Sequence, residues 1–154
     1  MNYRHAFHAG NFADVLKHAV LARILVHLAG KPAPFRVLDT HAGIGLYDLT
    51  GTEAARTGEW RDGIGRILAA PFPAPVAELL APWLAAVASA AGLTRPEHLT
   101  PERLTRYPGS PLVIRAGLRR DDRATVVELH PADAATLADL FAGDARVKVV
   151  ELDG

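Results

Sequence analysis

Three acidic side chains in this sequence stand where short apolar runs end: Asp39, Glu128 and Asp153. Each run has the length and composition of a buried strand. In open α/β sheets, ligands bind beyond the carboxyl ends of the strands, and an acid there accepts hydrogen bonds from ribose hydroxyls. The three acids therefore predict a cleft for a nucleoside.

The loop that begins at Asp39 reads DTHAGIG and contains two glycines, Gly43 and Gly45. Glycine lets a backbone turn sharply and lets a ligand approach it closely. The pattern differs from the dinucleotide-binding fingerprint, because Asp48 stands where the third glycine would be. This difference disfavours a nicotinamide-dependent oxidoreductase. The loop alone is equally typical of an ordinary strand-to-helix turn, and the acids after the other two runs favour a ligand site.

Histidines and basic residues gather near the N-terminus, and two interpretations of them differ. A metal site is disfavoured because the histidines show no recognised zinc spacing and the chain has no cysteine. With aromatic residues interleaved, the same segment fits contacts to phosphate and to an unstacked RNA base. A solvated surface is the alternative. The residues concerned are Tyr3, Arg4, His5, Phe7, His8, Lys17 and His18.

Composition limits the classes of partner. The 154 residues include 17 basic and 17 acidic side chains, so no global field attracts nucleic acid or an anionic membrane, and any such contact must be local. No segment has the form of a secretory signal or a membrane span. We expect a soluble cytoplasmic protein that binds neither a membrane nor a metal.

The N-terminal part of the chain predicts a helix over residues 11–29. Asn11 is suited to cap its first turn, and Gly30 with Pro32 marks its end. Apolar side chains recur every fourth residue, as in an amphipathic helix. They are Phe12, Leu16, Val20, Ile24 and Leu28.

The rest of the chain predicts strands over residues 35–38, 124–129 and 147–152, with helices before the second and third strands. Ser110 is expected as the N-cap of one helix, and the other covers residues 131–143. Alternation of helix and strand favours an α/β fold with a parallel, Rossmann-like sheet.

The segment 51–109 breaks this alternation and reads as a small helical insertion. Its alanine-rich helix is expected to break near Pro82. We therefore divide the chain into residues 1–50, which hold the N-terminal helix and the start of the Rossmann-like domain, the helical subdomain 51–109, and the continuation of the domain, 110–154.

Several motifs together resemble the RlmJ family, S-adenosylmethionine-dependent methyltransferases that modify N6 of an adenine in 23S ribosomal RNA. The motifs are YRHAFHAGNFADVLKH, LDTHAGIG, RTGEW, YPGSPL, ELHP and the terminal DG. The resemblance runs from Tyr3 to the last residue. It implies a Rossmann-like methyltransferase sheet with a helical subdomain, S-adenosylmethionine as cofactor and 23S ribosomal RNA as partner.

The resemblance also assigns roles to individual positions. Lys17 and His18 would line the methionine side of the cofactor, and Glu128 would hold its ribose. Asp153 and Gly154 would contact its adenine. The remaining expected cofactor contacts are Asp39, His41, Gly43, Gly45 and Ser110. Tyr3 and Arg4 belong to the segment that resembles the substrate side of the family's site.

One family motif does not occur in this sequence. Adenine-N6 methyltransferases of this kind use an Asp-Pro-Pro-Tyr loop to accept hydrogen bonds from the target amine, and no such motif is present. The catalytic acid is therefore expected beyond Gly154, and the chain is expected to be a fragment with little activity alone. Its first strand would then be an unpaired sheet edge through which chains associate.

Two other functional classes stay open at this stage. One is a non-catalytic module that binds cofactor or nucleic acid. A role in the use of external DNA has been attached to relatives of the family, but the sequence shows no carboxylate cluster suited to two metal ions.

Overall fold

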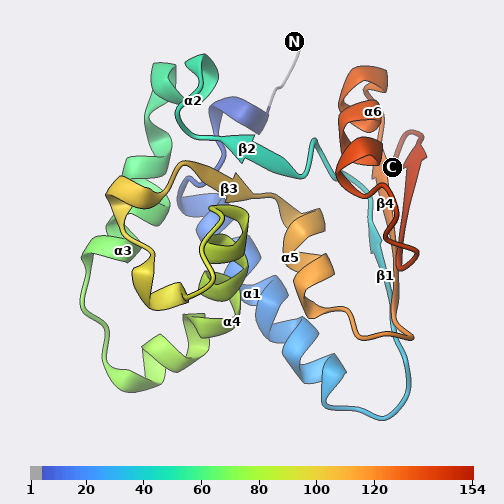
Figure 1. The fold of residues 1–154 in the computed structure, drawn as a ribbon, viewed down its shortest axis with the longest axis horizontal. Coiled ribbons are helices and arrows are strands. Elements are labelled where there is room, and N and C mark those ends of the chain that lie inside the picture. Colours follow the sequence, from blue (N-terminus) through green and yellow to red (C-terminus); the bar gives the residue numbers. More distant parts are fainter. Residues whose placement is uncertain (1–4) are drawn as a thin grey trace.

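The computed structural model describes residues 5–154 and has an α/β fold (Figure 1). The strands are β1 (Arg36–Asp39), β2 (Leu46–Asp48), β3 (Arg106–Pro108), β4 (Arg123–Glu128) and β5 (Val147–Glu151). The α-helices are α1 (Phe12–Ala29), α2 (Thr52–Thr57), α3 (Arg66–Ala69), α4 (Ala74–Ala90), α5 (Ser110–Gly117) and α6 (Pro131–Leu140). Shorter helical segments are η1 (His5–Phe7), η2 (Arg61–Gly65), η3 (Pro96–His98) and η4 (Pro101–Arg103).

The main sheet has three parallel strands in the order β1-β4-β5. All three strands predicted from the sequence are confirmed, with ends that differ by one residue. Val37 lies opposite Ala124, and Ala124 lies opposite Val147, so one row of small apolar side chains crosses the sheet. Within the described residues β1 is an edge strand, as expected.

Helices pack on one face of this sheet. Leu112 of α5 and Leu137 of α6 form a buried cluster with Val126 of β4, and Figure 1 shows α1, α4 and α5 on the same side of the strands. The opposite face carries Leu38, which is 65% exposed, and the exposed Lys148. Parallel sheets are normally covered on both faces, so this face lacks a layer within residues 5–154.

Helix α1 confirms the predicted segment and its cap. The side chain of Asn11 accepts hydrogen bonds from the backbone N–H groups of Ala13 and Asp14. The face of the helix that enters the core, however, is not the apolar stripe found in the sequence. The buried residues of α1 are Asp14, His18, Ala22 and Leu25, whereas Phe12, Leu16, Val20 and Ile24 are 50 to 76% exposed.

Two features within and just before the inserted segment differ from the sequence prediction. Helix α4 continues through Pro82 instead of breaking there. A proline removes one helical hydrogen bond, but Trp83 and Val87 just after it are fully buried and hold the second half of the helix in line. The second feature is an antiparallel ribbon of β2 and β3, which the sequence analysis missed.

The ribbon and the insertion share the main hydrophobic core. Tyr107 of β3 and Trp83 of α4 are both fully buried, and they belong to the same cluster as Leu25 of α1 and Ile114 of α5. Because this core spans α1, α4, α5 and the ribbon, the ribbon is fixed against the helices that border the sheet.

Within residues 5–154, none of the helices combines the length and apolar character needed to cross a bilayer.

Candidate functional site

Glu128, at the end of β4, joins the loop after the neighbouring strand β1 to the loop after its own strand. Its Oε2 accepts a hydrogen bond of 2.8 Å from the backbone N–H of Gly43, and its Oε1 accepts one of 2.9 Å from the N–H of His130. A carboxylate has about four lone-pair positions, so each oxygen retains capacity for another donor. The orientation of the carboxylate is thus fixed, and it is still able to accept hydrogen bonds from hydroxyl groups.

Asp39, at the end of β1, holds the start of α5. Its Oδ2 accepts a hydrogen bond of 2.7 Å from the hydroxyl of Ser110, and its Oδ1 accepts one of 3.3 Å from the N–H of His41. The prediction that Ser110 caps its helix is wrong: Gly109 is the N-cap, and no side chain caps this terminus. The hydroxyl of Ser110 is directed to Asp39 instead.

The two glycines of the loop after β1 both have positive φ, at +61° for Gly43 and +78° for Gly45. Side chains lie against both glycines. A Cβ at Gly43 would overlap the hydroxyl of Tyr47, and a Cβ at Gly45 would lie 2.7 Å from Leu140 and 2.9 Å from Leu137. In this loop, Gly45 therefore allows close packing against α6.

The end of β5 lies beside the same loop. The N–H of Leu152 donates a hydrogen bond of 3.2 Å to the carbonyl of Glu128, and a Cβ at Gly154 would overlap the carbonyl of Thr40. Asp153 is exposed between these two contacts. His41 is also exposed, and its Nδ1 lies 2.9 Å from the hydroxyl of Thr40. The structure thus gathers all three strand-end acids, with Gly154, at one edge of the sheet.

A second polar cluster forms around the first turns of α1. Asp14 is 1% exposed and accepts a hydrogen bond of 3.0 Å from the N–H of Gly10. His5 lies 2.8 Å and Lys17 3.1 Å from its two carboxylate oxygens. Burial alone raises the pKa of Asp14, but the hydrogen bond from His5, the electrostatic interactions with His5 and His18, and the hydrogen bond from the Gly10 N–H outweigh it and lower the pKa to about 2.

His18 occupies the buried side of the same helix. Its Nδ1 lies 3.0 Å from the hydroxyl of Tyr107, and the two rings are stacked. Burial lowers the pKa of His18 to about 4, although the charge of Asp14 opposes the shift. His18 is therefore neutral at pH 7. Lys17, one residue earlier, is 62% exposed at its side chain.

Tyr47 contacts both the strand-end loop and the polar cluster around the first turns of α1. Its hydroxyl lies against Gly43 in the strand-end loop, and its ring meets the ring of His5 edge to face, with centroids 5.1 Å apart. The sequence analysis did not single out Tyr47, Tyr107 or Asp14. The signal available for Asp14 was its spacing to Lys17 and His18, which places the three side chains on one side of a helix.

Tyr3 and Arg4 lie outside the described residues. Among residues 5–154, no three histidine or acidic side chains are grouped so as to hold a metal ion.

A family model described as "Ribosomal RNA large subunit methyltransferase D, RlmJ" matches residues 32–154. The chain belongs to the RlmJ family. It is 42% identical over 156 residues to "Ribosomal RNA large subunit methyltransferase J" of Escherichia coli K12 and 39% identical over 150 residues to the Haemophilus influenzae protein of the same name. These alignments cover 100% and 97% of this chain, but 51% and 50% of the two relatives. The chain thus spans about half the length of the RlmJ relatives it matches.

A solved structure supports the fold. A crystal structure of a Legionella pneumophila protein, described there as a member of the family DUF519, matches with a TM-score of 0.77 and 33% sequence identity. The match covers 94% of this chain and 49% of the other. The α/β fold with a parallel sheet is therefore shared with this relative.

Proposed function

We propose that this RlmJ-family chain provides the S-adenosylmethionine-binding part of an enzyme that methylates N6 of an adenine in 23S ribosomal RNA. The observation that supports this most is Glu128, a strand-end carboxylate fixed by two backbone N–H donors and still able to accept from ribose hydroxyls. The names of the relatives, which call them ribosomal RNA large subunit methyltransferases, support the reaction class.

The residues present fit the chemical groups of the cofactor. Glu128 would hold the ribose, and Asp153 with Gly154 would lie along the adenine. The exposed Lys17 and the neutral His18 would face the methionine side. Asp39 with Ser110, and His41 with the two loop glycines, would shape the remaining wall. When bound, S-adenosylmethionine supplies a methyl group on a positively charged sulfur.

The target amine needs a group that this sequence lacks. The lone pair of an adenine N6 is delocalised into the ring, so transfer requires a positioned acceptor for its protons. No Asp-Pro-Pro-Tyr motif occurs in the chain. We infer that this acceptor comes from a polypeptide corresponding to the second half of the RlmJ relatives, and that Tyr3 and Arg4 contact the RNA.

Calorimetric titration of the chain with S-adenosylmethionine tests the cofactor site, with NAD as a control ligand. We expect saturable binding of S-adenosylmethionine only. Glu128→Gln keeps the shape of the side chain but removes its charge, and should weaken binding about 10- to 100-fold, since hydrogen bonds to charged groups contribute about 1.5–3 kcal/mol. Asp139→Ala, an exposed acid on α6, is the matched control and should bind like the unchanged chain.

The outcomes separate the cofactor site from the reaction. Equal binding by the Glu128→Gln variant and the unchanged chain would refute the ribose role. Transfer of a methyl group to ribosomal RNA is then assayed with and without the second half of the E. coli relative. If the combined halves bind S-adenosylmethionine but never transfer its methyl group, the chain is a binding module and the proposed reaction is wrong.

A further inference from the structure

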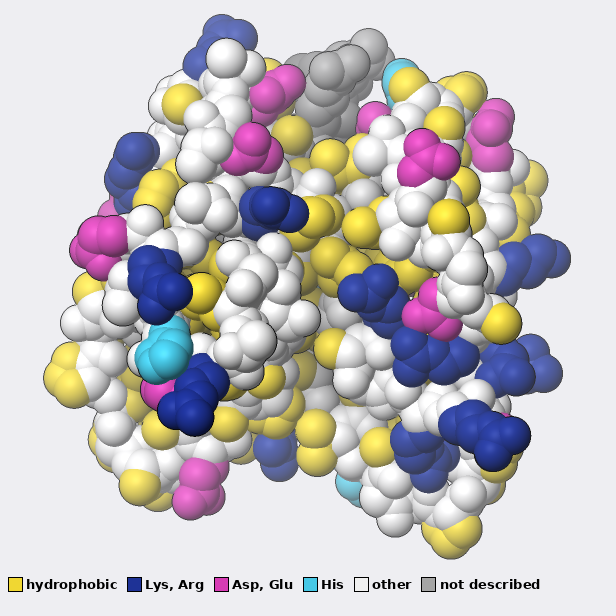
Figure 2. Space-filling view, in the orientation of Figure 1, with side chains coloured by type: hydrophobic (Ala, Val, Ile, Leu, Met, Phe, Trp, Pro, Cys, Tyr) yellow, Lys and Arg dark blue, Asp and Glu magenta, His cyan; other side chains and the backbone are white. Residues whose placement is uncertain are grey.

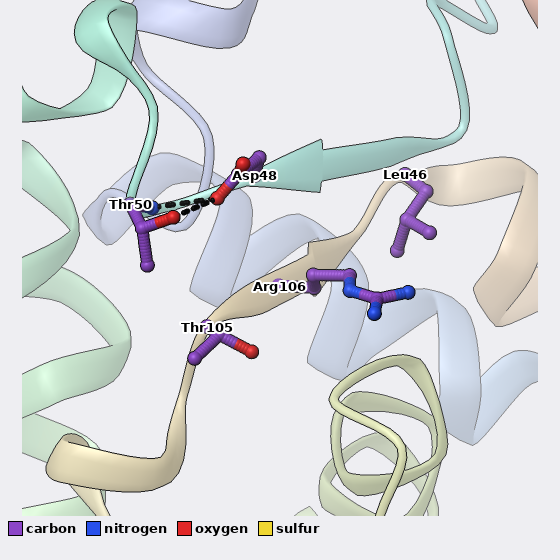
Figure 3. Close-up of a pocket in the computed structure, with 5 residues that line it drawn as sticks. All are labelled: Leu46, Asp48, Thr50, Thr105 and Arg106. Carbon is purple, nitrogen blue, oxygen red and sulfur yellow. Dashed lines mark hydrogen bonds between the residues drawn. The ribbon is translucent and has the colours of Figure 1, made fainter.

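A surface hollow of about 520 Å³ lies along the ribbon of β2 and β3, outside the residues assigned to the cofactor (Figure 3). Its lining residues are Leu46, Asp48, Thr50, Thr105 and Arg106. Figure 2 shows a depression with apolar side chains near the middle of this face of the molecule. The volume falls within the range of small-molecule and nucleotide sites, about 300–1,000 Å³.

Arg106, the cation in this hollow, forms no direct ion pair with its nearest acid, Asp48, although its charge helps to lower the pKa of that acid. Arg106 lies directly opposite Asp48 in the ribbon. Asp48 is instead bound to Thr50: its Oδ1 accepts hydrogen bonds of 2.8 Å from the backbone N–H and 2.6 Å from the hydroxyl. Figure 3 shows the Arg106 guanidinium directed away from Asp48 and toward Leu46. Within residues 5–154 this guanidinium makes no ion pair or hydrogen bond, so all its N–H groups are available to a ligand.

The side chains around Arg106 fit a nucleotide. A guanidinium binds phosphate with two parallel hydrogen bonds, and its flat face also stacks on bases. Leu46 offers an apolar surface beside it, and Figure 3 shows the Thr105 hydroxyl on the same side of β3 as the guanidinium. One phosphate with its neighbouring base and ribose would use the charge, the hydroxyl and the apolar side chain together.

The ribbon is anchored to the loops of the candidate cofactor site. Strand β2 begins one residue after Gly45, and β3 leads through Gly109 to Ser110. The N–H of Gly109 donates a hydrogen bond of 2.8 Å to the carbonyl of Gly45, which ties the two loops together. A nucleotide held in the hollow would therefore lie next to the cofactor loops on the outer surface of the molecule.

We propose that this hollow binds a nucleotide of single-stranded RNA that flanks the methylated adenine, with Arg106 on its phosphate and Leu46 against its base or ribose. The inference rests on the proposed function for the identity of the RNA. It adds an RNA contact on the ribbon to the contacts proposed for Tyr3 and Arg4.

The test measures binding of a fluorescent 12-nucleotide single-stranded RNA to the 154-residue chain by anisotropy, over a series of salt concentrations. Arg106→Ala should weaken binding about tenfold and make the dependence of log affinity on log salt shallower by about 1, as loss of one phosphate contact predicts. Arg103→Ala is the matched control. Arg103 is also an exposed arginine and lies only three residues before Arg106, but it does not line the hollow. Arg103→Ala should change neither the affinity for RNA nor the salt dependence of that affinity.

A second variant guards against a merely structural effect. Asp48→Asn removes a negative charge from the hollow and should tighten RNA binding a few-fold, which loss of folding would not do. Heparin, a polyanion without bases, serves as a competitor probe. If Arg106→Ala weakens heparin binding as much as RNA binding, the site recognises charge alone and the RNA assignment is wrong.

The experiment distinguishes this inference from the proposed function. Unchanged affinity and salt dependence in Arg106→Ala, or no RNA binding by the unchanged chain, would overturn the inference whatever the result with S-adenosylmethionine. Conversely, RNA binding that depends on Arg106 in a chain that does not bind S-adenosylmethionine would uphold the hollow as an RNA site while refuting the proposed cofactor site.

Discussion

His18 illustrates how burial changes the chemistry of one side chain. In sequence it is one of seven histidines, and its proximity to Lys17 suggested a basic surface. In the structure it is 4% exposed, and its Nδ1 lies 3.0 Å from the hydroxyl of Tyr107, a residue 89 positions away in the sequence. An imidazole in such surroundings is kept neutral, because its charged form would lose hydration. It suits a hydrogen-bonded wall of a site better than a cationic contact.

The pKa of His18 predicts that the chain loses stability in mild acid. Its pKa falls from 6.5 in the unfolded chain to about 4 in the folded chain, so the unfolded state binds more protons between these values. The free energy of unfolding should therefore decrease as the pH falls from 6.5 to 4, by about 3 kcal/mol in total. The pKa of Asp14 is also lowered, but its effect falls below pH 3.8, outside this window.

Urea unfolding at pH 7, 5.5 and 4 measures this effect. His18→Gln should flatten the pH profile between 6.5 and 4, whatever its stability at pH 7. His27→Gln, on the exposed side of the same helix, is the control and should keep the profile of the unchanged chain. A flat profile in the unchanged chain would contradict the buried, neutral state of His18.

At the scale of elements, α1 shows why a pattern can find a helix and still assign its faces wrongly. Apolar residues occur on both sides of α1, so periodicity alone cannot select the side that meets this core. Two polar residues, Asp14 and His18, lie on the buried side because each has a specific partner there. The stripe formed by Phe12, Leu16, Val20 and Ile24 is left 50 to 76% exposed in the described chain.

The contact between the loop after β1 and helix α6 can be tested with a pair of glycines. Gly45 and Gly92 have nearly the same φ, +78° and +77°, but only Gly45 has neighbours where a Cβ would stand. Gly92→Ala should cost about 1–2 kcal/mol for the left-handed conformation alone. Gly45→Ala should cost about 1–3 kcal/mol more, because Leu137 and Leu140 must move. Equal losses in urea unfolding would show that α6 does not constrain this loop.

At the scale of the whole molecule, the arrangement leaves apolar surface uncovered. β1 has one unpaired edge, Leu38 is 65% exposed on the open sheet face, and the α1 stripe is exposed as well. Unpaired strand edges and apolar faces promote association with other chains. The RlmJ relatives are about twice as long, so in them additional chain is available to cover such surfaces.

We therefore expect the isolated chain to associate as its concentration rises. Light scattering during size-exclusion chromatography measures the mass across a concentration series. Leu38→Lys and Ile24→Lys should each reduce association and change the free energy of unfolding by less than about 0.5 kcal/mol, as for surface substitutions. Leu79→Lys, at a side chain of α4 that is 51% exposed, is the control and should not affect association. A monomer at every concentration would contradict the prediction.

Local chemistry in the sequence was enough to determine α1 with its Asn11 cap, the three parallel strands and the acids at their ends. These features depend on the period of apolar residues, on a cap next to its own helix and on short apolar runs. The motifs were also sufficient to indicate the RlmJ family, because several specific segments occur in the same order.

Only the tertiary structure decided which side chains meet. Asp39 holds Ser110 across 71 residues, and Glu128 binds the N–H of Gly43 across 85 residues. The ribbon pairs β2, just before the insertion, with β3, at the end of the insertion, and three-residue strands carry too little pattern to be recognised alone. The buried face of α1 and the free guanidinium of Arg106 likewise depend on neighbours distant in sequence. Such contacts form because the shared core brings these segments together, and no local pattern encodes them.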